Sequence, residues 1–150
     1  MKALIQRVSR GSVTINGEIC ASIGKGFVIL LGVRHGDERE SAFFLADKCA
    51  NLRIFEDAQG KMNLGLREVD GSVLVVSQFT LYAEAQKGNR PGFTLAARPE
   101  EAEPLYDLFV GRMRDVLGEE RVKTGVFRAM MNVEILNDGP VTILLEHPDG

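Results

Sequence analysis

The sequence predicts an α+β protein in which a mostly antiparallel sheet carries two helices packed on it. Three observations lead to this fold class. A hairpin signal follows the first apolar run, two stretches carry apolar residues at helical spacing, and two apolar runs stand near the end of the chain. A dinucleotide-binding fold is not expected, because no Gly-x-Gly-x-x-Gly follows a strand.

The composition indicates one globular domain over residues 1–150. Of the 150 residues, 45% are hydrophobic and 26% are charged, which is typical of a soluble protein with a substantial core. No apolar run approaches the roughly 20 residues of a membrane span, and no signal peptide is recognisable. Cys20 and Cys49 form no Cys-x-x-Cys pattern, so reduced structural thiols in a cytoplasmic protein are expected. The net charge of −3 argues against broad non-specific binding to nucleic acid but allows a local basic patch.

The first half of the chain is expected to form strands and one helix. The apolar runs predicted as strands cover residues 2–8, 12–15, 18–23 and 27–33. Asn16-Gly17 is a strong hairpin signal, because both residues tolerate a positive φ. Asp37 and Glu40 resemble a capping pair for a helix that should end near Asn51.

The second half repeats this alternation. Further strands are predicted at residues 53–55, 73–76, 131–136 and 141–145. Residues 84–92 are polar and indicate a mobile loop. A second helix with an apolar stripe should begin near Pro99 and stop at Gly118. The tail from His147 onward is expected to fray.

The segment Asn137-Asp138-Gly139-Pro140 stands between the last two apolar runs. Proline cannot donate to a strand ladder, an X-Pro bond can be cis, and glycine lets another group approach the backbone closely. Two interpretations stay open at this point. The segment is either a tight turn between strands or a rigid wall of main-chain carbonyls that contacts a ligand.

The sequence offers little for acid–base catalysis. His35 and His147 have no candidate nucleophile beside them in the sequence, so a Ser-His-Asp triad is a minor alternative. Two scattered cysteines and two scattered histidines do not predict a metal site. There is no phosphate-binding loop and no His-Glu-x-x-His.

A polar cluster follows the buried strand of residues 73–76. Ser77, Gln78 and Thr80 at a strand end can present side chains and main-chain N–H groups together, as in an oxyanion hole that needs no titrating residue. The competing interpretation is that the hydroxyls satisfy the strand-end backbone and that Phe79 and Leu81 are core residues.

Two motifs together resemble the signatures of the D-aminoacyl-tRNA deacylases: Ser77-Gln78-Phe79-Thr80-Leu81 and Asn137-Asp138-Gly139-Pro140-Val141-Thr142. The resemblance covers nearly the whole chain and is poor only after Leu145. Further matching segments are residues 3–8, 52–55 and 60–63, Arg90-Pro91 with Phe93, and Thr124-Gly125 with Phe127.

The resemblance implies a homodimer of β-barrel-like subunits with helices outside and active sites at the subunit interface. Gly139-Pro140 would be cis and would reach from one subunit into the site of the other. The substrate would be the 3′-terminal adenosine of a tRNA that carries a D-amino acid, and the reaction would hydrolyse that ester. No cofactor, metal or membrane partner is implied.

The resemblance also implies catalytic roles. Ser77 and Gln78 would position the substrate, and main-chain N–H groups near Phe79 and Thr80 would polarise the carbonyl. The neighbouring ribose hydroxyl could assist attack by water on the already activated ester. Whether the Thr80 hydroxyl is a nucleophile or shapes the site stays open; shaping is favoured, because no base is placed to activate it.

Chiral selection would come from Gly139 and Pro140. Their carbonyls would hold the α-amino group, and an inverted α-carbon would drive its side chain into this wall. Glycine has no side chain to exclude, so glycyl-tRNA should also be hydrolysed. Asn137, in the same motif, and Met130 are expected to help bind the substrate.

Other contacts with the tRNA end are open to two interpretations. Phe79 and Met130 would line the adenosine pocket or be ordinary core residues. Lys87, Arg90 and Arg98 would contact phosphates or belong to a solvated loop. Two rival functions are an editing module like that of some archaeal threonyl-tRNA synthetases, and a nucleic-acid-binding module without turnover.

Overall fold

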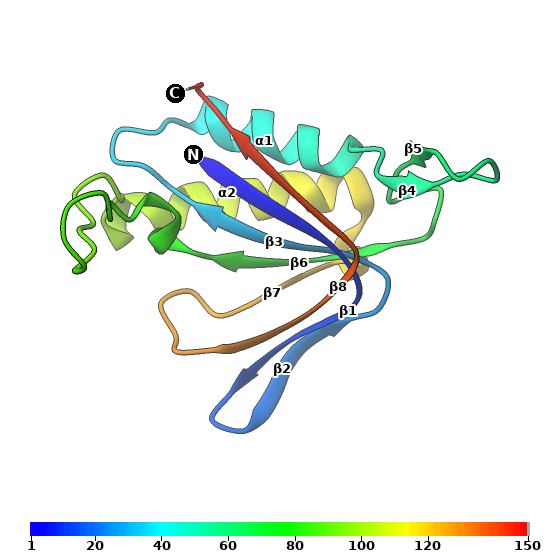
Figure 1. The fold of residues 1–150 in the computed structure, drawn as a ribbon, viewed down its shortest axis with the longest axis horizontal. Helices are drawn as coiled ribbons and strands as arrows, with labels where there is room; N and C mark the ends of the chain where they lie inside the picture. Colours follow the sequence, from blue (N-terminus) through cyan, green and yellow to red (C-terminus); the bar gives the residue numbers. More distant parts are fainter. Residues whose placement is uncertain (150) are drawn as a thin grey trace.

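Two helices cover one face of a strongly bent sheet in this protein, for which a computed structural model describes residues 1–149 (Figure 1). The strand order is β2-β1-β3-β6-β7, and β8 also pairs with β1. The strands are β1 (Lys2–Ile15), β2 (Glu18–Ile23), β3 (Gly26–Gly32), β6 (Ser72–Ser77), β7 (Val122–Thr124) and β8 (Asn132–Glu146), with β4 (Phe55–Glu56) and β5 (Met62–Leu64) in a separate pair. The helices are α1 (Arg39–Asn51), α2 (Pro99–Leu117) and the short 3₁₀ helices η1 (Phe79–Tyr82) and η2 (Glu119–Arg121). The predicted α+β fold is confirmed.

The strand directions follow from the connections between them. β1 runs antiparallel to β2, β3 and β8, whereas β6 is parallel to β3 and to β7. Parallel neighbours need a long crossover, and the chain supplies α1 before β6 and α2 before β7. Both helices therefore lie on the same face of the sheet (Figure 1).

The first strand is longer than predicted. Residues 2–8 and 12–15 were expected to be separate strands, but β1 is continuous and bends between its two halves. Its first half pairs with β3 and its second half with β2. Gly11 allows the bend, because a Cβ added there would lie 2.7 Å from Val28 Cγ2. The residues between the two predicted strands therefore form a bend within one continuous strand.

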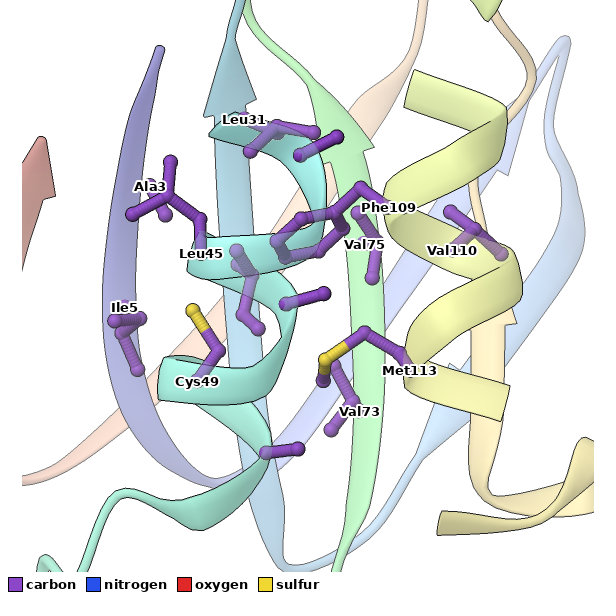
Figure 2. Close-up of a cluster of buried hydrophobic side chains, with 14 of the residues drawn as sticks. Ala3, Ile5, Leu31, Leu45, Cys49, Val73, Val75, Phe109, Val110 and Met113 are labelled. Carbon is purple, nitrogen blue, oxygen red and sulfur yellow. The ribbon is translucent and has the colours of Figure 1, made fainter. Parts of the chain in front are cut away.

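The main core lies between the sheet and the helices. Leu45 and Cys49 of α1 and Phe109 and Met113 of α2 point toward Val73 and its neighbours on β6 and β3 (Figure 2). All of these side chains are fully buried. Side chains at i and i+4 share one face of a helix, which is the apolar spacing that predicted both helices.

A second core fills the opposite face of the sheet. Val8, Val13 and Ile23 meet Leu74 and Val76 there. This happens because the second half of β1, the strand β2 and the first half of β8 fold back over that face. The result is a nearly closed, barrel-like sheet, as the resemblance implies.

The start of α1 differs from the prediction. The N-cap is Glu38, with no side-chain capping bond, so the expected capping pair of Asp37 and Glu40 is wrong. The Asp37 carboxylate instead accepts a hydrogen bond from the main-chain N–H of Arg34 at 2.6 Å, which closes the turn before the helix. The second helix ends as predicted, with Gly118 at φ 102° after Leu117.

The last two apolar runs form one strand, so the tight-turn interpretation of Gly139-Pro140 is wrong. In the pairing of β8 with β1, Gln6 faces Thr142 and Val8 faces Asn137, so two steps on β1 oppose five on β8. Residues 138–141 therefore bulge out of a strand that stays paired on both sides. A bulge is where a strand can accept a proline and a glycine at positive φ. Gly139 has φ 128°, and the Gly139-Pro140 peptide bond is cis, as the resemblance implies.

The described part of the tail is anchored rather than frayed. The main-chain N–H of His147 donates to the carbonyl oxygen of Met1 at 3.0 Å. The His147 ring stacks on Phe44 with centroids 4.3 Å apart. The tail therefore extends the pairing of the first and last strands, and Gly150 lies outside the described residues.

The two thiols differ in environment. Cys49 is in the main core and Cys20 is exposed on β2, so the expectation of two structural thiols holds only for Cys49. Burial raises the pKa of the Cys49 thiol to about 12, which leaves it uncharged and unreactive at neutral pH. Within residues 1–149, no helix combines the length and the apolar character needed to cross a membrane.

Candidate active site

A cavity of about 620 Å³ opens at the C-terminal end of β6. Its walls come from β6, η1, the start of α2, the segment of residues 127–131 and the first residues of β8. The predicted residues that line it are Ser77, Gln78, Phe79 and Met130. The predicted residues that do not line it are Thr80, Asn137, Gly139 and Pro140.

The end of β6 turns sharply to present its polar residues. The main-chain N–H of Gln78 still bonds the carbonyl oxygen of Leu31 at 2.8 Å, and the chain then enters η1. Gly32 makes room for this turn, since a Cβ there would lie 3.0 Å from both Gln78 O and Leu81 Cβ. The sequence predicted that the strand ends before this polar cluster, and the structure adds that a 3₁₀ turn follows it.

The turn leaves donors free. Among the described residues, the main-chain N–H groups of Phe79 and Thr80 and the hydroxyl of Ser77 form no hydrogen bond. The first N–H groups of a helix have no partner within it. The site therefore offers hydrogen-bond donors beside the cavity without a charged side chain. In the described structure, the Ser77 hydroxyl forms no hydrogen bond with the backbone at the strand end. This argues against the interpretation that Ser77 only satisfies that backbone.

Thr80 faces Gln78 rather than a base. The Gln78 side-chain amide donates to the Thr80 hydroxyl oxygen, and Thr80 is exposed. The histidines are elsewhere: His35 pairs with Glu101 at 2.9 Å and His147 lies against Ser41. No general base therefore lies within hydrogen-bond reach of Thr80 among the described groups.

His147 has a hydroxyl neighbour in the fold that its neighbours in the sequence do not supply. Its Nδ1 lies 3.0 Å from the Ser41 hydroxyl, a contact between residues that are far apart in the sequence. Ser41 is only 4% exposed, and no carboxylate within the described chain hydrogen-bonds the His147 ring. The pair anchors the tail to α1 and is not open to an ester substrate.

The aromatic and sulfur side chains at the cavity are exposed rather than part of the core. Met130 is 91% exposed and Phe79 is 54% exposed, so the interpretation of both as ordinary core residues is wrong. Phe127 lines the inner wall and packs on Tyr106 at 5.7 Å. Tyr106 in turn donates to the carbonyl oxygen of Val75 at 2.9 Å, and burial raises the pKa of its hydroxyl. This contact fixes α2 to β6 directly before Ser77.

Sequence reasoning missed the small apolar part of the wall. Ala97, Pro99 and Ala102 line the cavity where the chain enters α2. These side chains are short and apolar, so the first turn of α2 adds an apolar part to the cavity that Phe127 also lines. Their only signal in the sequence was the run of small residues just before and within the helix start.

The Gly139-Pro140 bulge lies at the other end of the sheet. Ser77 pairs with Leu31, Leu31 with Ala3, and Ala3 with Leu145. Across the sheet, Ser77 and Leu145 are three strand spacings of about 4.8 Å apart. Along β8, Pro140 is five residues from Leu145, at about 3.3 Å per residue. The two displacements together separate the motifs by on the order of 20 Å. Figure 1 shows the C-terminal end of β6 and the bend of β8 at opposite ends of the sheet. The structure does not bring the two motifs together within one chain.

Arg7 holds the bulge from inside. Its Nε donates to Asp138 O at 3.1 Å and its Nη1 to Ile54 O at 2.8 Å, while the residue is only 5% exposed. Glu56 supplies a carboxylate at 3.7 Å. The sequence contained a signal that was missed: Arg7 continues the inward-facing alternation of Ala3 and Ile5, and an arginine at a core position needs partners.

Asn137 braces the bulge from its own strand. Its side-chain amide donates to the Thr142 hydroxyl at 3.0 Å, and its side-chain oxygen accepts from the main-chain N–H of Val141 at 3.2 Å. These two bonds span the residues that leave the β1 ladder. Within one chain, Asn137 therefore shapes the bulge.

One basic side chain lines the cavity, and three more are exposed in the segment that leads to its wall at Pro99. Arg128 lines the cavity, and Lys87, Arg90 and Arg98 are exposed nearby in sequence. In the described structure none of these four takes part in an ion pair, unlike Arg10 and Arg112. No group of three or more His, Cys, Asp or Glu within residues 1–149 is arranged to hold a metal ion.

Comparison with known proteins identifies the family. The family model of D-Tyr-tRNA(Tyr) deacylases matches residues 4–146. A D-aminoacyl-tRNA deacylase of Symbiobacterium thermophilum is 55% identical over 146 residues, which cover 97% of this chain and 95% of the relative. The corresponding protein of Thermomicrobium roseum is 58% identical over 146 residues, with 97% and 94% covered.

Solved structures agree on the fold. The structure titled c-Myc DNA Unwinding Element Binding Protein superposes with a TM-score of 0.94 at 44% identity, covering 99% of this chain and 100% of that chain. A probable eukaryotic D-amino acid tRNA deacylase gives a TM-score of 0.83 at 17% identity, with 96% and 97% covered, which supports the fold alone. From the family match and the identity to curated relatives, this chain belongs to the D-aminoacyl-tRNA deacylase family of hydrolases.

Proposed function

We propose that residues 1–150 act as one domain that hydrolyses the ester of a D-aminoacyl-tRNA to free tRNA and a D-amino acid, in the cytoplasm. The observation that carries this proposal is the cavity at the end of β6, where Ser77 and Gln78 meet an apolar wall. Its volume of about 620 Å³ is in the range of roughly 300–1,000 Å³ typical of small-molecule sites, enough for the terminal adenosine and its amino acid.

The chemistry needs few protein groups. Water attacks the ester carbonyl carbon, the bond from that carbon to the ribose oxygen breaks, and the ribose oxygen takes up a proton. The free N–H groups of Phe79 and Thr80 would stabilise the oxyanion that forms. Ser77 and Gln78 would orient the ester, and the neighbouring ribose hydroxyl would assist the attacking water. Thr80, which accepts from Gln78, would shape the site.

Adenosine binding would use the apolar wall. Pro99 and Ala102 line the same cavity as Phe127, and the exposed Met130 also lines it. An adenine ring fits between such apolar surfaces, since every base has a π-face that stacks on them. Lys87, Arg90 and Arg98 would face the phosphates.

A second copy of the chain would complete the site. The motif of Gly139 and Pro140 lies on the order of 20 Å from Ser77 in the same chain, too far to contact the same amino acid. A homodimer would bring the bulge of one subunit to the cavity of the other, so that active sites form at the interface. An exposed apolar residue of the sheet supports a contact between subunits: Leu144 of β8, which pairs with Leu4 of β1, is exposed.

Chiral selection would follow from the rigidity of the bulge. Arg7 and Asn137 bond the bulge backbone at Asp138 O and at the Val141 N–H. Each of the two side chains is itself anchored, Arg7 by Ile54 O and Asn137 by the Thr142 hydroxyl, so a side chain pushed against the bulge would meet a rigid wall. Overpacking of this kind costs roughly 1–3 kcal/mol or more. L-amino acids would be excluded, while glycine, which has no side chain, would be accepted.

The test is a comparison of three esters. Purified protein is incubated with D-tyrosyl-tRNA, L-tyrosyl-tRNA and glycyl-tRNA, and release of labelled amino acid is followed. The proposal expects rapid loss of the D-tyrosyl and glycyl esters and persistence of the L-tyrosyl ester. Equal loss of both tyrosyl esters would contradict the chiral wall.

A nucleic-acid-binding role without turnover is a second candidate. One structure of 44% identity carries a title that names a DNA unwinding element binding protein, and the basic residue Arg128 lines the cavity of this chain. The net charge of −3 and the free donors at the strand end favour turnover instead. Tight binding of D-tyrosyl-tRNA with no release of tyrosine would favour the second candidate.

A further inference from the structure

A pair of exposed aromatic rings stands at the rim of the cavity. The rings of Phe79 and Phe93 meet edge to face, with centroids 5.1 Å apart and an angle of 63° between their planes. Phe79 is 54% exposed and Phe93 is 39% exposed. Phe79 lines the cavity, but Phe93 does not. The pair therefore continues the apolar wall outward from the cavity to the surface.

Phe93 directly follows the loop of residues 84–92, whose two ends are hydrogen-bonded to each other and whose middle part is basic. Glu84 and Gly92 exchange two main-chain hydrogen bonds of 2.8 Å, and the Thr94 hydroxyl donates to the Glu84 carboxylate at 2.5 Å. These bonds close the base of the loop, and residues 86–91 project from the body of the protein beside η1 (Figure 1).

Residues 86–91 carry two positive charges and no negative charge. Lys87 and Arg90 are exposed, and in the described part of the chain neither forms an ion pair or a side-chain hydrogen bond. Glu84, the nearest carboxylate along the loop, is engaged by Thr94. The loop therefore carries two unpaired cations within six positions of Phe93, whose ring meets that of Phe79.

We propose that Phe93, supported by Phe79, is a stacking platform for the nucleotide that precedes the terminal adenosine, with Lys87 and Arg90 facing the phosphates of the single-stranded tRNA end. This inference rests on the proposed function, which places the terminal adenosine in the cavity. The strand must then leave the cavity over its rim. Aromatic rings beside free cations are the surface that single-stranded nucleic acid binds, since bases stack on rings and phosphates pair with cations.

The chemistry distinguishes this occupant from a polypeptide. A protein partner would cover the rings but would gain little from two solvated cations with no hydrogen-bond partner. A second copy of the chain offers an overall charge of −3 without a phosphate-like row of charges. A single-stranded RNA end supplies both bases that stack on the rings and phosphates that pair with the cations.

The experiment compares two substrates of different length. D-tyrosyl-tRNA presents the preceding nucleotides, whereas 2′(3′)-O-D-tyrosyl-adenosine presents only the terminal nucleoside. Phe93→Ala should lower the ratio of kcat/KM for the tRNA to kcat/KM for the adenosine ester by roughly 5- to 100-fold, the range that stacking of one base gives. Phe93→Trp, which keeps an aromatic face, should retain the ratio.

A neighbouring residue supplies the matched control. Leu95 is 37% exposed near Phe93 in the chain and is not aromatic, so Leu95→Ala should leave the ratio unchanged. Lys87→Ala with Arg90→Ala should lower the ratio and flatten its salt dependence. The log–log slope should change by about 0.7 for each single-strand phosphate that the double variant no longer neutralises.

Several results would overturn the platform. If Phe93→Ala lowers activity on both substrates equally, Phe93 only supports the cavity; if it lowers neither, no base stacks there. A change in oligomeric state of Phe93→Ala, measured by light scattering, would place the ring between subunits instead. If the wild-type protein hydrolyses neither ester, the proposed function itself fails and the platform falls with it.

Discussion

Arg7 Nε donates a hydrogen bond to the carbonyl oxygen of Asp138 at 3.1 Å, across 131 positions of sequence. The bond ties the first strand to the bulge that carries Gly139 and Pro140. It comes from a side chain that is almost fully buried and that also binds Ile54 O at 2.8 Å. The backbone of the bulge is thus positioned by the core rather than by its own loop.

Removal of this guanidinium should loosen the bulge. Arg7→Met would leave the carbonyl oxygens of Asp138 and Ile54 without their donors, at a cost of about 1–3 kcal/mol in the free energy of unfolding. We expect a lower urea midpoint and a smaller ratio of D-tyrosyl to L-tyrosyl ester hydrolysis.

The matched control is Arg10→Met. Arg10 lies in the same strand but is exposed and pairs with Glu134 at 3.0 Å. Exposed pairs contribute roughly 0–1 kcal/mol, so stability should change little and chiral selection not at all. Similar effects of the two substitutions would remove the special role of Arg7.

Gly139→Ala tests the bulge directly. A Cβ there would lie 2.8 Å from Val141 Cγ2 and 3.1 Å from Arg7 Nη2, at a φ of 128° that L side chains rarely adopt. We expect D-tyrosyl ester turnover to fall at least tenfold. Gly111→Ala is the control, because Gly111 is in α2 with open space around it and alanine favours the helix by roughly 0.5–1 kcal/mol. Unchanged turnover in Gly139→Ala would argue against a site built from this backbone.

Mixing two inactive variants tests the shared site. Ser77→Phe blocks the cavity and Gly139→Ala damages the bulge, so neither homodimer should be active. A heterodimer would contain one site with an intact Ser77 from one subunit and an intact Gly139 from the other. Random pairing then restores about one quarter of the wild-type activity in a two-fold dimer. If activity stays at the level of the separate variants after unfolding and refolding together, each site belongs to one chain.

The thiols provide a test of the core. Cys49 is buried, and its pKa of about 12 keeps it protonated, so a thiol reagent at pH 8 should modify only the exposed Cys20. In denaturant both should react. Rapid native reaction at Cys49, located by peptide mass mapping, would mean that α1 opens easily from the sheet.

Much of the fold could be predicted from local signals. Helical spacing located α1 and α2, and Asn16-Gly17 located the hairpin of β1 and β2, because these signals act over a few residues. The continuity of β1 and β8 could not be predicted this way. Each strand stays intact only because the other pairs with it along most of its length, which is a contact between the two ends of the sequence.

The site was predicted unevenly for the same reason. Ser77 and Gln78, which line the cavity, could be proposed from the sequence because a polar pair at the end of a buried strand is a local pattern. The alternation of β1 marks Arg7 as inward-facing, but its partners Asp138 and Ile54 are distant in the sequence, and the place of Ala102 in the cavity wall likewise depends on tertiary neighbours. The resemblance named Gly139 and Pro140 and implied that they serve the site of the other subunit, which fits their distance of on the order of 20 Å from Ser77 in their own chain.

The pairing of Lys2 with Glu146 also bears on how this protein is made. During translation, β1 emerges with one edge that stays unpaired until residues 132–146 leave the ribosome. Contacts of such wide sequence separation form slowly, and an open strand edge invites association with other nascent chains. Synthesis of this protein is therefore expected to benefit from a chaperone that shields β1 until the last strand arrives.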